Sequence, residues 1–250
     1  MPSYHKNTKN RSETDVRDLA AKFGVVGELS SEPVPDSKGE ITYDISQLPA
    51  HFSANNKDFM TWNLEDEKDQ DPKLVPTDSD AGMIADVFIA SHGTYPGNVR
   101  VSIGHTQAES CDTTITPEPC KVVSERTDVF YYHIVDGYVF LPDWMSVEMG
   151  EHGHIIRFVS RWNSYEKTDN VKIIPPSEAV KILQKSGVQF DQRDVVMGKV
   201  TINSFKIVYG YADPMVWTDR VVPLYHFKGE FKGTNGTSSW EQYILALKET

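Results

Sequence analysis

Residues 176–183 read Pro-Ser-Glu-Ala-Val-Lys-Ile-Leu, and our fold prediction starts from this stretch. Its acidic residue is followed by Ala179, Ile182 and Leu183, which recur at the three- and four-residue spacing of one helix face. Gly187 follows and is typical of a helix end. The stretch therefore predicts an amphipathic helix.

The same pattern occurs twice earlier in the chain. Each earlier copy begins with a hydroxyl residue followed three positions later by an aspartate, the pattern of a helix N-cap. These pairs are Ser12 with Asp15 and Thr77 with Asp80. The apolar residues with helical spacing are Val16, Leu19, Ala20 and Phe23 in the first copy and Ala81, Ile84, Ala85 and Phe88 in the second.

Strand candidates follow each helix. In residues 204–211, large apolar side chains at 205, 207, 209 and 211 alternate with Ser204, Lys206, Val208 and Gly210, which is the two-residue period of a half-buried strand. Asp136-Gly137, between two apolar runs, predicts a tight hairpin. In residues 155–162 the alternation places Phe158 on one face and Arg157 and Arg161 on the other.

These patterns predict an α+β fold of two to three helix-plus-antiparallel-sheet modules. We expect an N-terminal helix with short strands over residues 1–64. A central helix and antiparallel sheet would follow over 77–168, and a C-terminal module over 171–250. The uneven distance between the helices argues against a solenoid, which would keep a fixed repeat length.

Charge and hydropathy narrow the class of protein. The net charge of −11 comes with no dense run of Lys and Arg, so we expect no nucleic-acid partner. No stretch approaches the roughly 20 apolar residues of a membrane span, so we expect no transmembrane segment. The first residues lack the apolar region of a signal peptide. If the protein is exported, a signal or anchor segment is absent from this sequence; the alternative is a cytosolic protein.

Two cysteines bear on the compartment. Cys111 and Cys120 flank one polar loop, and their number and spacing predict a local disulfide, which persists in oxidising surroundings. The alternative is a pair of unpaired thiols. Asn10 and Asn235 each begin an Asn-x-Ser/Thr triplet and are candidates for glycosylation.

The sequence contains no motif that obliges catalysis. Phosphate-binding loops, nucleophile elbows and zinc-binding patterns are missing, and we predict no catalytic residue and no cofactor. Glu151, His152 and His154 could hold a divalent metal, but a polar hairpin tip explains them more simply. Trp144 and Trp217 lie in candidate loops and are candidates for ligand contact.

The third segment resembles a known family. Residues 176–183, Ile207–Tyr211, Val222–Phe227 and Tyr243–Leu247 together resemble PepSY-like domains, including the extracellular YycH- and YycI-type regulators of a bacterial sensor kinase. They also resemble uncharacterised surface lipoproteins of bacteria and archaea. The resemblance is clearest over residues 171–248, weaker over 77–165 and marginal over 13–64. It implies an extracytoplasmic location and a binding or regulatory role, and it supplies no catalytic residue.

We therefore predict a secreted or cell-surface protein that is not an enzyme. It would bind a protein partner, regulate one, or assemble with copies of itself, for which exposed edge strands are suited. Two alternatives stay open: a peptidase-inhibitory role of the PepSY type, and a hydrolase whose site forms between modules.

Overall fold

The computed structural model shows a chain built mainly of strands. It describes residues 1–7, 10–30, 32–36, 39–64, 71–93, 96–110, 120–186, 198–213, 216–233 and 236–248. Of these described residues, 60% lie in strands and 18% in helices. These residues contain thirteen strands and three α-helices, and the strand pairs are both antiparallel and parallel. The predicted α+β fold of helix-plus-antiparallel-sheet modules is therefore wrong.

The chain divides into two compact units, each assembled from separate stretches of sequence. Unit 1 comprises Met1–Asn7, Val135–Pro142 and Ser164–Thr250, and unit 2 comprises Thr8–Ile134 and Asp143–Asn163. Strand β8 (Tyr138–Met149) begins in unit 1 and continues in unit 2. Each unit therefore depends on segments that are distant in sequence.

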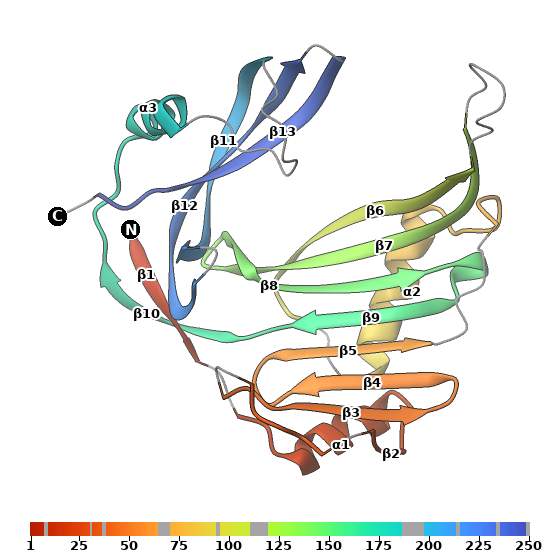
Figure 1. The fold of residues 1–250 in the computed structure, drawn as a ribbon. Helices are drawn as coiled ribbons and strands as arrows, with labels where there is room; N and C mark the ends of the chain where they lie inside the picture. The colour runs from red at the N-terminus through yellow and green to blue at the C-terminus, as the bar shows by residue number, and fades with distance from the viewer. Residues whose placement is uncertain are drawn as a thin grey trace. The chain divides into compact units, whose positions relative to one another are not determined.

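Unit 2 is a sheet with helices on one face only. Besides the end of β8, its elements are α1 (Glu13–Lys22), β2 (Glu28–Leu29), β3 (Thr42–Gln47), β4 (Ala50–Asn55), β5 (Phe59–Leu64), α2 (Asp78–Ser91), β6 (Val99–Ser110), β7 (Lys121–Val135), the 3-10 turn η1 (Glu151–Gly153) and β9 (Ile155–Arg161). The strand order is β6-β7-β8-β9-β5-β4-β3-β2. In Figure 1, α2 lies behind the strands, and no helix of the described residues covers the face of this sheet toward the viewer.

The covered face holds the core of unit 2. Val16 and Ala20 of α1 and Ala85 and Ile89 of α2 are fully buried, together with inward-facing strand residues such as Phe158. Because side chains alternate along a strand, the neighbours of these strand residues point to the helix-free face.

Unit 1 is built around a long antiparallel hairpin. Its elements are β1 (Pro2–Asn7), the first residues of β8, β10 (Ser164–Asn170), α3 (Pro176–Ser186), β11 (Gly198–Asp213), β12 (Val216–Gly233) and β13 (Gly236–Leu245). Strand β12 pairs along its length with β11, and β1 and β13 pair with different parts of its other edge. β11 also meets β8 in a parallel pair at Tyr209 and Phe140.

Unit 1 has its own buried core. Tyr225, Phe227 and Trp240 of the sheet pack with Ala179 and Leu183 of α3. A second, aromatic cluster includes Tyr4, Phe140 and Tyr209, whose rings lie within 5.0 Å of one another, centroid to centroid. The Tyr4 hydroxyl donates a 2.6 Å hydrogen bond to Asp136 and so connects β1 to the β7–β8 turn.

Several local predictions are confirmed. α1 has a full capping box between Ser12 and Asp15, and Thr77 caps α2 by accepting from the Asp80 amide. Asp136 and Gly137 both have positive φ, as a tight hairpin turn of this type requires. The third helix also forms at the predicted place.

The modular prediction is wrong because of which strands become neighbours. Strand β5, from the first predicted segment, pairs with β9, from the second, through contacts such as Trp62 with Phe158. Strand β1 was not predicted, and it pairs with β10 and β12 from the far end of the chain. Local periodicity does not predict such pairings, because the two-residue period of a strand does not identify the strand beside it.

Candidate functional site: the arginine–aromatic face

The helix-free face of unit 2 carries a row of large side chains across three neighbouring strands. Arg161 of β9 pairs directly with Trp144 of β8 on one side and with Phe59 of β5 on the other. Directly opposed residues project from the same face, so the three side chains form one row. The Arg161 guanidinium carbon lies 5.5 Å from the centre of the Phe59 ring, within the range of a cation–π contact.

A second row lies further along the same strands. Arg157 of β9 pairs with Glu148 of β8 and with Asn63 of β5. Arg126 of β7 reaches the same row and forms a 2.8 Å ion pair with Glu148. Arg157 is exposed and makes no ion pair with any other residue that the structure describes. This row therefore combines a paired arginine with a solvent-accessible one.

Short side chains separate the two rows. Ser146, Val159 and Thr61 lie opposite one another on β8, β9 and β5. Val159 and Ser146 are buried, and the Thr61 hydroxyl is buried without a hydrogen-bond partner. Because Arg157 and Arg161 are four residues apart on a strand, their Cα atoms are about 13 Å apart.

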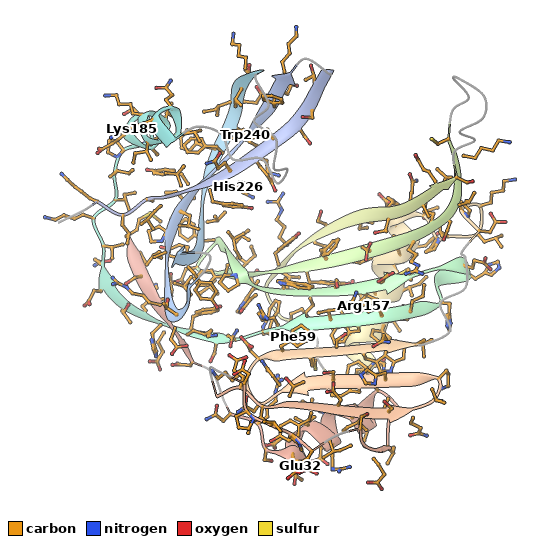
Figure 2. The ribbon with its side chains drawn as sticks, viewed as in Figure 1. Glu32, Phe59, Arg157, Lys185, His226 and Trp240 are labelled. Carbon is orange, nitrogen blue, oxygen red and sulfur yellow. The ribbon has the colours of Figure 1, made fainter. Side chains whose placement is uncertain are left out.

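We call this surface the arginine–aromatic face and define it by Phe59, Arg126, Trp144, Arg157 and Arg161. Figure 2 labels Phe59 and Arg157 on the side of the sheet that has no helix. Three of the eight arginines of the chain lie here, in a protein whose net charge is −11. Planar guanidinium groups suit carboxylates and stack on flat groups.

One carboxyl group beside this face is electrostatically perturbed. Burial raises the pKa of Asp128 on β7 above its usual value, and the charge of Glu148 adds to the effect. A 2.9 Å hydrogen bond from the Thr106 hydroxyl and the charges of Arg126 and Arg157 oppose it. The arginines therefore have two acidic neighbours, Asp128 and Glu148, whose carboxylates can also accept hydrogen bonds from hydroxyl groups.

A buried polar network supports the first row from the opposite side of the sheet. The side-chain nitrogen of Asn163 donates to Asp143 (2.8 Å) and to Asp58 (3.1 Å), and the backbone amide of Asn163 donates to Asp143 (3.0 Å). His133 Nδ1 lies 2.9 Å from Asp143, and its ring stacks on Trp162. Such satisfied buried networks hold the surrounding structure in one arrangement.

Three residues of this network are sequence neighbours of the row that it supports. Asp58 precedes Phe59, Asp143 precedes Trp144, and Trp162 follows Arg161. Fixing these backbone positions fixes the spacing of the aromatic rings and the guanidinium on the other face. A rigid scaffold of this kind is what a binding surface needs for preorganisation.

Of the two tryptophans predicted to contact a ligand, only the side chain of Trp144 is described. Trp144 lies in strand β8 rather than in the predicted loop, half-buried, and is part of the arginine–aromatic face. The side chain of Trp217 lies outside the described residues. The alternation of residues 155–162 predicts that Arg157 and Arg161 share a face. It does not predict that Phe59 and Trp144 flank Arg161, because that depends on the order of the strands.

The three residues of the predicted metal candidate lie at one turn. Glu151, His152 and His154 surround turn η1, and Glu151 accepts a 2.8 Å hydrogen bond from the Asp71 amide. Within the described ranges, no three His, Cys, Asp or Glu side chains are grouped to hold a metal ion.

Two other predicted sites are only partly described. Cys111 lies outside the described residues, so its disulfide with Cys120 stays a prediction. Asn10 is exposed just before α1, whereas Asn235 lies outside the described residues.

In the part of the chain that the structure describes, no helix has the length and apolar character needed to cross a membrane.

One arrangement superficially resembles a hydrolytic triad. The Ser46 hydroxyl lies 2.8 Å from His51 Nδ1, and Asp44 lies 3.8 Å from His51 Nε2. The second distance is too long for a hydrogen bond, so the carboxylate does not orient the imidazole as a triad requires. This geometry does not favour acyl transfer at Ser46.

Comparisons with known proteins give fold similarity alone. The sequence matches no family model and no curated protein. The chain is similar in structure to an uncharacterised protein from Eubacterium rectale ATCC 33656, with a TM-score of 0.59 and 14% sequence identity over 97% of this chain and 82% of that chain. The resemblance to PepSY-like domains stays a prediction.

Proposed function

We propose that the protein is a non-enzymatic binding protein that holds its ligand on the arginine–aromatic face. The observation that carries the proposal is the row of Phe59, Arg161 and Trp144 on a face that no helix covers. An amphipathic ring next to a guanidinium is a frequent composition of binding surfaces, where Trp and Arg contribute much of the affinity.

Rigidity of the face supports binding rather than turnover. The row rests on the buried network of Asp58, Asn163 and Asp143. Its side chains are therefore already ordered, and little conformational entropy is lost when a ligand binds. The Ser46–His51–Asp44 geometry gives no support for hydrolysis. We also propose an extracytoplasmic location, for which the spacing of Cys111 and Cys120 is the supporting feature.

The proposal is tested on arrays of surface glycans and peptides. The wild-type protein is compared with a Trp144→Ala/Arg161→Ala variant, which removes two members of the row. A Phe205→Ala/Arg220→Ala variant serves as the matched control, because both side chains are exposed on unit 1. Circular dichroism and thermal melting check that each variant is folded.

We expect wild-type signals on at least one ligand class that survive in the control and fall at least about tenfold in the face variant. Mass spectrometry of the bound ligand should show it unchanged after prolonged incubation. Signals that persist in the face variant, or a ligand that is cleaved, would refute the proposal.

A further inference from the structure

The arginine–aromatic face has a charge and a shape that restrict its ligand. We infer that the ligand is an extended oligosaccharide that carries carboxylate groups. This inference rests on the proposed function and names the chemical class that the face would bind.

Charge is the first restriction. Arg157 is exposed and has no ion-pair partner among the described residues, and Arg161 lies on the same face four residues further along β9. Guanidinium groups form bidentate, charge-assisted hydrogen bonds with carboxylates. The rest of this acidic chain repels anions, so an anionic ligand is guided toward the few positions where arginines gather.

Flat apolar surface is the second restriction. The rings of Phe59 and Trp144 flank Arg161 on neighbouring strands, which are about 4.8 Å apart. Pyranose rings have an apolar face that packs on aromatic rings, so a sugar at the Arg161 row can contact Phe59 or Trp144 beside it. Their hydroxyls can bond to Asn63, Glu148 and Asp128 beside the arginines.

A peptide fits this face less well. The backbone groups of β8, β9 and β5 are engaged with one another in the sheet. A peptide lying across the face would therefore lose hydration of its own amides without finding backbone partners, whereas an edge strand would provide them. Sugar hydroxyls need only the side chains that the face supplies.

Length is the third restriction. The two arginine rows are about 13 Å apart along β9, so one carboxylate cannot reach both. A ligand that uses Arg157 and Arg161 together must be an extended chain rather than a single sugar acid.

Calorimetric titration of the full chain with tetragalacturonate tests the inference. The methyl ester of the same tetramer is the matched neutral probe, galacturonate monomer tests length, and hexaglutamate tests an acidic peptide. Arg157→Gln and Trp144→Ala are the variants, and Arg220→Gln is the control arginine on unit 1.

We expect tetragalacturonate to bind, with affinity that falls as salt is raised. The methyl ester, the monomer and the two face variants should each give affinity at least about tenfold weaker, and Arg220→Gln should bind like wild type. Equal binding of the ester or the monomer, tighter binding of hexaglutamate, or full binding by Arg157→Gln would overturn the inference.

The two proposals fail separately. If tetragalacturonate does not bind but other array signals still require Trp144 and Arg161, the sugar-acid assignment is wrong and the binding role stands. If no array signal depends on these residues, both are wrong.

Discussion

His226 shows how a single buried residue couples unit 1 to pH. Its Nε2 lies 2.9 Å from Glu241, its ring stacks on Tyr243, and its Nδ1 is buried without a partner. Burial lowers the pKa of His226 below its usual value of about 6.5. The hydrogen bond to Glu241 acts in the opposite direction and is outweighed.

The sign of the pH effect follows from this lowered pKa. Below about pH 6.5 the unfolded chain takes up a proton at this histidine, while the folded chain does so only at lower pH. The free energy of unfolding should therefore fall as pH decreases from about 6.5 toward the folded-state pKa. Above about 6.5 this residue should add no pH dependence.

Urea unfolding of wild type and His226→Gln between about pH 5 and 8 measures this contribution. Glutamine can still donate to Glu241 but does not titrate. We expect the wild type to lose more stability than the variant on acidification, and parallel pH profiles would contradict the assignment.

At the scale of the element, the β11–β12 hairpin depends on a close backbone approach. The register shifts between Ile202 and Ser204, opposite Gly229 and Lys228. A Cβ on Gly229 would overlap the carbonyl oxygen of Thr201 on the facing strand. Only glycine allows the two strands to approach this closely.

Gly229→Ala should therefore lower the free energy of unfolding by more than about 2 kcal/mol, because backbone must shift to admit the methyl group. Gly97→Ala is the control, since nothing lies within 4 Å of its added Cβ. We expect the control to change stability by less than about 0.5 kcal/mol in the same urea titration. Similar losses in both variants would show that the close approach is not the cause.

For the molecule as a whole, the proposed extracytoplasmic location depends on whether the two cysteines form a disulfide. If Cys111 and Cys120 are bonded, a thiol reagent should label neither cysteine in the denatured, unreduced protein and both after reduction. Closing so short a loop should stabilise the folded chain by about 2–3 kcal/mol. Labelling of both without reductant would remove the main support for an oxidising compartment.

The sequence predicts the two arginines of β9 in the arginine–aromatic face but not the aromatic residues beside them. Alternation along residues 155–162 placed Arg157 and Arg161 together, because the faces of a strand follow directly from its two-residue period. The flanking positions of Phe59 and Trp144 come from pairing across β5, β9 and β8. The supporting network joins Asp58 to Asn163, which are 105 residues apart.

The local elements of this protein follow from short stretches of its sequence. The caps at Ser12 and Thr77, the helical spacing after them and the Asp136-Gly137 turn depend on neighbouring residues alone. The pairing of β5 with β9 and of β1 with β12, in contrast, depends on how the whole chain folds. The reason is physical: helix caps and turns are satisfied within a few residues, whereas a strand can satisfy its backbone groups with any strand that the whole chain brings beside it.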